Sequence, residues 1–331
     1  MTTTQPPLVV AVGAINWDVT LFVESLPSPG QEVTVSEVAR VPGGTAANVA
    51  VAAARLLSPD VAVFVGALGD DAIADRQRDI LRAEGVSTDG IVTIPETESG
   101  QAFILVDTNS QNVIASALGA NAQLTPDHIR QPAARVMLSR ARACAITDPP
   151  LSVIEEILYI TTATYCRVSW DPGVLVTGDK SIVLPMARRM DTLLLNEEET
   201  ATLFEQDAPR QIAVRLLADG WRNRVILKKG GQGATVIDLA NSQLIEVPPL
   251  PLNELGMIPV NSVGAGDAFH GALAALEAEG REFTDALLGA TAAAGINVSR
   301  PGTRDAPTSD ELAQVLAAWR EMGGAVSTSP L

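Results

Sequence analysis

Residues 261–273, NSVGAGDAFHGAL, contain an acid directly after three small residues, Gly264, Ala265 and Gly266. The apolar residues after Asp267 predict a helix that begins at this turn. The first turn of a helix has backbone N–H groups without intrahelical partners, and with the helix dipole they form an anion site. A carboxylate there can be a helix cap, or a general base beside a phosphate cradle. The segment alone supports both interpretations equally.

A second glycine pair precedes another predicted helix. Gly43 and Gly44 lead into a run, AANVAVAAARL, whose second turn carries Asn48. The pair can form a simple tight turn. It can also let a small polar ligand touch the backbone, while Asn48 offers both a donor and an acceptor.

Several common catalytic signatures are absent from the sequence. It contains no Gly-Lys dipeptide, and no G-x-G-x-x-G follows the first predicted strand. This argues against a Walker A loop and weakens a dinucleotide-binding interpretation. H-E-x-x-H and G-x-S-x-G are also absent, so zinc hydrolysis and a nucleophile elbow have no support.

The elements around these motifs alternate as in an α/β protein. Continuous apolar runs predict strands buried on both faces at residues 8–15, 61–68, 141–147, 166–170, 192–196 and 224–230. Helices are predicted between them at residues 46–57, 73–84, 151–161, 197–205, 209–218, 266–279 and 284–297. This alternation implies a mostly parallel sheet with helices on both faces.

Two regions break the alternation. Residues 19–42 and about 96–120 read as strands without helices, half apolar and half polar. They predict a small accessory sheet, a lid that covers a site at the carboxyl ends of the main strands. Because no linker separates independent domains, we expect a single domain over residues 8–320, with residues 1–7 and 324–331 as flexible tails.

Composition limits the partners. The formal net charge is −16, and no basic cluster occurs, which argues against binding nucleic acid or an anionic membrane. Only three lysines are present, Lys180, Lys228 and Lys229. Cys144 and Cys166 are expected to be buried free thiols in a reducing compartment. The N-terminus lacks the features of a secretory signal and no long apolar run occurs, so we expect a cytoplasmic protein.

Three features together resemble the ribokinase-like (PfkB) family of carbohydrate and nucleoside kinases. They are the strand followed by GAINWD, the GGTAAN turn and the GAGD turn. The resemblance runs from about residue 8 to residue 314. It implies a three-layer α/β/α fold with a mostly parallel central sheet and a small β-sheet lid. It also implies ATP as phosphoryl donor, Mg²⁺, and a small hydroxylated acceptor.

The resemblance assigns a role to each candidate site residue. Asp267 matches the catalytic base of the family, and Gly264, Ala265 and Gly266 match its anion hole. The implied substrate-binding residues are Asn16, Asp18, Gly43, Gly44, Asn48 and Asp148. The implied nucleotide-binding residues are Asn196, Lys228, Gly230, Gly233 and Asn297. Glu199 matches an acid that acts indirectly on Mg²⁺, although a solvated first helical turn would also explain it. His270, a lone histidine, is expected to serve packing or hydrogen bonding.

The chain also departs from the pattern. Most ribokinases carry Asp-Thr where this chain has Asn261 and Ser262, and that Asp is linked to a potassium site. K⁺ is therefore a possible further cofactor, but the missing charge argues against it. The Asn is similar to the phosphosugar-kinase branch, whose Asn-Pro-Ala opening is nevertheless absent here. Trp17 could line the acceptor pocket or pack under the lid.

The sequence therefore predicts an ATP-dependent kinase that transfers the γ-phosphoryl group to a hydroxyl of a small sugar. Three alternatives remain open. They are a nucleoside kinase on the same fold, a phosphosugar kinase, and a non-catalytic sugar- or nucleotide-binding regulatory protein. Because exposed lid edges can pair between subunits, we also expect a homodimer formed through the lid.

Overall fold

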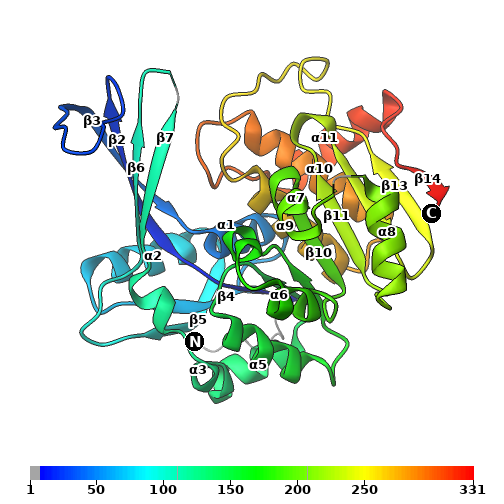
Figure 1. Ribbon diagram of the computed structural model, residues 1–331, viewed down its shortest axis with the longest axis horizontal. Helices are drawn as coiled ribbons and strands as arrows, with labels where there is room; N and C mark the ends of the chain where they lie inside the picture. The colour runs from blue at the N-terminus through cyan, green and yellow to red at the C-terminus, as the bar shows by residue number, and fades with distance from the viewer. Residues whose placement is uncertain (1–7, 110, 207) are drawn as a thin grey trace.

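A large sheet runs through the part of the chain that the computed structural model describes, residues 8–109, 111–206 and 208–331 (Figure 1). From edge to edge its strands are β14 (Ser327–Pro330), β13 (Gln243–Val247), β12 (Ala234–Asp238), β11 (Arg224–Lys228), β10 (Thr192–Asn196), β9 (Arg167–Trp170), β8 (Ala143–Ile146), β1 (Val9–Val12), β4 (Ala62–Leu68) and β5 (Val86–Thr93). The strands from β11 to β5 are parallel, and β12 to β14 are antiparallel additions. Each apolar run predicted as a strand forms part of this sheet.

Helices cover both faces of the sheet, so the fold has the three layers that were predicted. One layer contains α1 (Thr45–Leu56), α2 (Ala72–Ala83), α9 (Ala265–Ala278), α10 (Phe283–Val298) and α11 (Ser309–Glu321). The other contains α3 (Pro126–Arg130), α4 (Pro132–Arg140), α5 (Leu151–Thr161), α6 (Lys180–Ala187), α7 (Glu197–Phe204) and α8 (Pro209–Ala218). Short 3-10 turns lie at η1 (Gly119–Gln123), η2 (Gly173–Thr177) and η3 (Gly230–Gln232).

The central strands β1 and β8 are apolar throughout because each face of the sheet meets a helix layer. In β1, Val9 and Ala11 join the core under one layer, whereas Val10 and Val12 join the core under the other. All four side chains are fully buried. Continuous apolar runs of this kind are typical of strands in a doubly covered parallel sheet.

The predicted lid is a second, smaller sheet. Its strands β2 (Asn16–Val23), β3 (Val35–Gly43), β6 (Gln101–Val106) and β7 (Asn112–Ala117) are arranged in the order β3-β2-β6-β7. The strands project together from the α/β body (Figure 1). Because only three residues separate the end of β1 from the start of β2, the lid begins at the carboxyl edge of the large sheet.

The C-terminal residues differ from the prediction of a flexible tail over 324–331. Ser327–Pro330 forms β14 and pairs antiparallel with β13. The Arg210 guanidinium also donates to the carbonyl oxygen of Pro330 at 2.8 Å. Small polar residues give no apolar pattern, but their main chain can pair with the open edge of β13. The tail predicted at residues 1–7 lies outside the described residues.

Candidate active site

Polar side chains gather where the parallel strands end. Lys228 is the last residue of β11, Asp171 follows the end of β9 directly, and Asp148 follows β8 after one residue. The turn after β1 leads into the lid strand β2, which carries Asp18. The carboxyl ends of parallel strands meet at one edge of a sheet, and ligands bind there in α/β folds. The predicted substrate and nucleotide residues are thus brought to the same edge.

The turn that opens α9 requires glycine at its first position. Gly264 has a φ of +81°, in the left-handed region that favours glycine. A Cβ added there would lie 2.0 Å from the carbonyl oxygen of Thr303. The first amide groups of α9, from Ala265 onward, lie at the N-terminal end of a helix of 14 residues. Amides in such a position can bind an anion.

Asp267 lies in the first turn of α9, half-buried, and meets α1. The side-chain amide of Asn48 donates to its Oδ2 at 2.7 Å. Burial is the main cause that raises the pKa of Asp267 to about 7, with help from Asp171 and Asp148. The Asn48 hydrogen bond and the Lys228 charge partly oppose this rise. A carboxyl with a pKa near neutrality suits a general base.

Asp18 and Gly43 form a second contact near this acid, from the paired lid strands β2 and β3. A Cβ on Gly43 would lie 2.0 Å from Oδ2 of Asp18, so only glycine allows the carboxylate to rest against this backbone. Burial raises the pKa of Asp18 to about 6, and the charge of Arg304 opposes the rise. Within the described residues no donor lies within hydrogen-bond distance of this carboxylate, which leaves both oxygens available to a ligand.

The Asp148 carboxylate accepts hydrogen bonds from residues of three neighbouring segments of the protein. Its Oδ1 accepts hydrogen bonds from the Ala14 amide at 3.1 Å, from Thr45 at 2.9 Å and from Thr147 at 2.7 Å. The carboxylate therefore ties the start of α1 to the ends of β1 and β8. Gly44, directly before α1, adopts a φ of +94° as the helix begins.

Asn16 lies at the root of the lid. Its Oδ1 accepts from the Asn121 amide at 2.9 Å, and its backbone carbonyl accepts from Gln77 at 2.6 Å. These bonds hold the lid strand β2 to the body. The substrate contact predicted for Asn16 stays a prediction.

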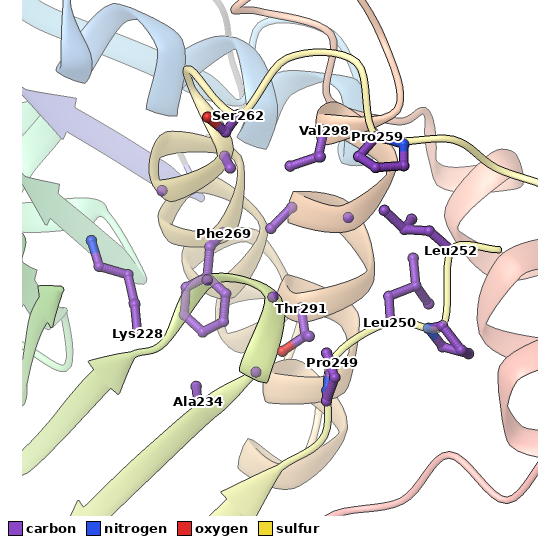
Figure 2. A pocket seen from close by; sticks show the side chains of 18 of the residues that line it. Lys228, Ala234, Pro249, Leu250, Leu252, Pro259, Ser262, Phe269, Thr291 and Val298 are labelled. Atoms are coloured by element: carbon purple, nitrogen blue, oxygen red, sulfur yellow. The ribbon is translucent and has the colours of Figure 1, made fainter. Parts of the chain in front are cut away.

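A cavity of about 630 Å³ lies beside the mouth of α9 (Figure 2). Its walls are largely apolar, with Leu250, Leu252, Phe269 and Val298 around it and with Gly230 and Gly233 at the β11–β12 turn. The volume is within the usual range of small-ligand pockets. Its apolar lining, next to helix amides and a lysine, fits a ligand with a flat apolar part and a phosphate chain.

Lys228 forms the polar end of this cavity. Its ammonium pairs with the Asp171 carboxylate, and it lies 3.5 Å from the position that a Cβ of Gly266 would take. Burial alone would lower the pKa of Lys228, but Asp171, Glu199 and Asp267 raise it overall. The neighbouring Lys229 instead approaches Glu246, at 3.9 Å. Of the two adjacent lysines, Lys228 is therefore the one that lies beside the glycine turn at the start of α9.

Asn196 and Glu199 form a capping box at the start of α7. The Glu199 amide donates to Asn196 Oδ1 at 2.8 Å, and the Asn196 amide donates to Glu199 Oε2 at 2.8 Å. Burial, followed by the charge of Asp171, raises the pKa of Glu199. Glu199 thus caps its helix and is half-buried rather than fully solvated, and its charge acts on Lys228. Its role toward Mg²⁺ stays a prediction.

Asn297 does not line the cavity. It is fully buried, and its amide donates to the carbonyl oxygen of Val263 at 3.3 Å. This hydrogen bond holds the segment before α9 against α10.

His270 is also fully buried. Its Nε2 lies 2.8 Å from the Ser169 hydroxyl, and burial lowers its pKa to about 4. The expectation of a packing role for His270 is confirmed.

Sequence reasoning missed Asp171 and Arg304. Asp171 follows a correctly predicted strand, and its position at a strand end was a usable signal. Arg304 contacts Asn48 and Gly43 across more than 250 positions of sequence, and no local pattern indicates such a contact.

Further observations limit other kinds of site. Among the described residues, no group of three or more His, Cys, Asp or Glu side chains is arranged to hold a metal ion. No helix in the described ranges has the length and apolarity needed to span a membrane. Cys144 and Cys166 are buried free thiols, as expected.

Known proteins share this sequence and fold over nearly their full length. Residues 6–310 match the family described as pfkB family carbohydrate kinase. A ribokinase of Haemophilus influenzae is 28% identical over 311 residues, which cover 92% of this chain and 97% of that protein. An ATP-dependent ribose-1-phosphate kinase of Halopiger xanaduensis is 27% identical, with 93% and 98% covered. The structure of Arabidopsis thaliana ribokinase complexed with ribose and ATP aligns with a TM-score of 0.83 at 26% identity, covering 94% of this chain and 99% of that one.

Proposed function

Because the chain belongs to the pfkB family of carbohydrate kinases, we propose that it transfers the γ-phosphoryl group of ATP to a hydroxyl of a small sugar. One observation carries the proposal. Asp267, with a pKa of about 7, lies in the first turn of α9, and the apolar cavity lies beside the start of this helix. Asn48 donates to Asp267 and accepts from Arg304. Arg304 in turn donates to the backbone of Gly43, against which the Asp18 carboxylate rests. Transfer to a hydroxyl needs a base and an anion cradle close together.

The residues divide the work by position. Asp18 is proposed to accept hydrogen bonds from acceptor hydroxyls, and Asp267 to take the proton of the hydroxyl that attacks. The amides from Gly264 to Asp267 would stabilise negative charge that develops at the helix mouth. The donor nucleotide supplies the electrophilic phosphorus when bound. The cavity with Gly230, Gly233 and Lys228 fits it, because a Cβ at Gly230 would meet nothing within 4 Å and Lys228 lies against the helix mouth.

Mg²⁺ is proposed to enter with the nucleotide. Mg²⁺ is often bound through substrate phosphates and water with only one or two carboxylates. The charges of Asp171 and Glu199 act on Lys228 at the end of the cavity, so these two carboxylates are proposed to contact the hydration shell of the Mg²⁺ ion. This agrees with a site that lacks a dedicated protein cage for the metal among the described residues.

The pH dependence of kcat/KM tests the base. A carboxylate accepts a proton only when it is ionised, so the rate is expected to rise with pH and to reach half its maximum near pH 7, the pKa of Asp267. Asp18, with a pKa of about 6, must also be ionised. A plot of log(kcat/KM) against pH should therefore have a slope of about one between these values and about two below pH 6. A flat profile from pH 5 to 8 would contradict the assignment.

A nucleoside acceptor is less well supported. A nucleobase needs an apolar or aromatic slot, and Trp17 was the candidate. Trp17 is 6% exposed, and the Arg76 guanidinium lies 4.8 Å from the centroid of its ring. Trp17, on the lid strand β2, is therefore packed against Arg76 and offers little exposed surface to an acceptor.

A phosphosugar acceptor is the second candidate. The Halopiger relative is named a ribose-1-phosphate kinase and is as similar to this chain as the ribokinases are. A non-catalytic binding protein is disfavoured because Asp267, the glycine turn and Lys228 are all in place.

A coupled ADP-release assay tests the proposed function. Mg·ATP would be combined with pentoses, hexoses, ketoses, phosphosugars and nucleosides. We expect one sugar or phosphosugar to exceed the ATPase background, and this excess to vanish in Asp267→Asn. ADP release that is equal with and without every acceptor would reject the kinase proposal.

Independence from K⁺ is expected from Asn261. Its side-chain amide donates to the Pro301 carbonyl at 2.8 Å, and its Oδ1 accepts from the Val263 amide at 3.0 Å. An aspartate could not donate to that carbonyl, which would then be free for a cation. Initial rates in K⁺ and in tetramethylammonium at equal ionic strength should therefore agree. Asn261→Asp is expected to create K⁺ activation, and strong K⁺ activation of the wild type would contradict this.

A homodimer through the lid and action in the cytoplasm complete the proposal. The lid sheet has two edge strands, β3 and β7, that are paired on one side only. It also exposes several apolar side chains: Phe22, Val35, Val38, Val41, Phe103, Val113 and Ile114. Exposed strands of this kind favour pairing with a second copy. Light scattering during size exclusion should give twice the chain mass, and Ile114→Lys should shift it to one chain.

A further inference from the structure

Arg304 is a buried cation between the two halves of the site. It lies in the segment between α10 and α11, and only 8% of its surface is exposed. Its Nε donates to Asn48 Oδ1 at 2.7 Å, and its second terminal nitrogen donates to the Gly43 carbonyl. The remaining terminal nitrogen has no partner within the described residues. The guanidinium therefore binds Asn48, the partner of Asp267, and Gly43, the neighbour of Asp18. It forms no ion pair with either carboxylate.

The contact with Asn48 fixes the direction of its amide. An arginine can only donate, so the side-chain oxygen of Asn48 must face Arg304. The nitrogen must then face Asp267, which accepts its hydrogen bond. If the Asn48 amide were reversed, its oxygen would face the Asp267 carboxylate and its NH₂ group would face the Arg304 guanidinium. Neither pair could then form a hydrogen bond.

We propose that Arg304 is a positioning residue for phosphoryl transfer, which fixes Asn48 as a donor to Asp267 and holds the Gly43 backbone against Asp18. The inference rests on the proposed function for its catalytic meaning. The contact chain itself, Asp267 to Asn48 to Arg304 to Gly43, is independent of the acceptor's identity.

The charges around Asp267 define what loss of Arg304 should do. Asp148 and Asp171, after β8 and β9, oppose ionisation of Asp267. Lys228, at the end of β11, and the Asn48 amide on α1 favour it. Arg304 adds a positive charge that interacts with both Asp18 and Asp267. Without Arg304 the Asn48 amide can reverse, so the ionised form of the base loses a donor and a nearby cation.

Arg304→Met tests the role, and Arg300→Met is the matched control. Arg300 lies in the same segment and also donates to a backbone carbonyl and a side-chain acceptor, those of Asp305 and Glu311, outside the site. We expect Arg304→Met to raise the pKa of Asp267 by about one unit, measured by carbon NMR titration of aspartate labelled at the carboxyl carbon. Arg300→Met should not move it. The acidic limb of the kcat/KM profile should shift equally, with kcat/KM reduced about 10- to 100-fold.

Arg304→Lys keeps the charge and one donor, so a partial return of kcat/KM and of the pKa is expected. Testing Arg304→Met in an Asn48→Leu background separates the effect of the Asn48 hydrogen bond from the effect of the Arg304 charge on the pKa of Asp267. If the amide carries the effect, Arg304→Met should shift the pKa far less in that background. A full shift there would mean that Arg304 acts through space and would overturn the positioning role, as would an unchanged pKa in Arg304→Met.

These outcomes are separate from the proposed function. Failure of the wild type to phosphorylate any acceptor rejects the kinase proposal, whereas the NMR titration needs no turnover. A drop in melting temperature shared by Arg304→Met and Arg300→Met, with no pKa change, would reduce Arg304 to a structural brace.

Discussion

Asp267→Asn is expected to lower kcat by about 10²–10⁴-fold, the usual contribution of a general base. The substitution keeps the shape of the side chain, and its amide oxygen can still accept the Asn48 hydrogen bond. The glycine turn that is proposed to bind the phosphates is unchanged, so ATP affinity should stay close to that of the wild type. Single-turnover rates and nucleotide titration would separate the two effects. Turnover near the wild-type rate would remove Asp267 from the role of base.

Stability gives an internal check on this variant. Because the pKa of Asp267 is raised from 3.8 to about 7 by folding, its ionisation costs folding free energy. The protonated form of Asp267 therefore favours the folded state, and this contribution to the free energy of unfolding is present at low pH and is lost as the pH rises through 7. A neutral amide avoids the cost, so at pH 8 the melting temperature of the variant should equal or exceed that of the wild type.

Asp285→Asn is the matched control for Asp267→Asn. Asp285 is also an acid in the first turn of its helix, α10, but it pairs with Arg320 at the surface. If an acid at this position acted only through the helix dipole, the two variants would behave alike. We expect the control to retain full activity.

Asp18→Ala is expected to lower kcat/KM for the acceptor by about 10²–10⁴-fold, since hydrogen bonds to a charged group contribute about 1.5–3 kcal/mol each and the two carboxylate oxygens of Asp18 can accept from two sugar hydroxyls. The loss should appear mainly in KM for the acceptor. KM for ATP should change little, because Asp18 is on the lid strand β2 and does not line the apolar cavity. Glu37→Ala, an exposed acid on the neighbouring lid strand β3, is the control. An unchanged KM for the acceptor would show that Asp18 does not bind it.

The sequence predicted the parts of the fold whose pattern follows from burial. Strands such as β1 and β8 are covered on both faces, so they are apolar throughout and could be recognised. β14 could not, because its pairing depends on main-chain groups of β13 and not on its own side chains. α11 was missed although Thr308 and Glu311 form a capping box, which is a readable local signal.

The site was predictable where its chemistry is local. The turn at Gly264 and the acid at Asp267 are adjacent in sequence, so their geometry follows from helix capping. The roles of Asp18 and Asn48 came from the family resemblance. Arg304 was out of reach, because its importance arises from contacts with Asn48 and Gly43 that exist only after folding.

The closing strand β14 also bears on how this protein should be handled. It covers the edge of β13, and the Leu331 amide extends the contact by donating to the Ser242 carbonyl at 3.0 Å. Removal of the last residues would bare a row of unpaired main-chain groups, which is a template for aggregation. An affinity tag fused at the C-terminus would pull on the same strand. Protein that keeps Ser327–Pro330 intact and carries no C-terminal tag should therefore be the more soluble preparation.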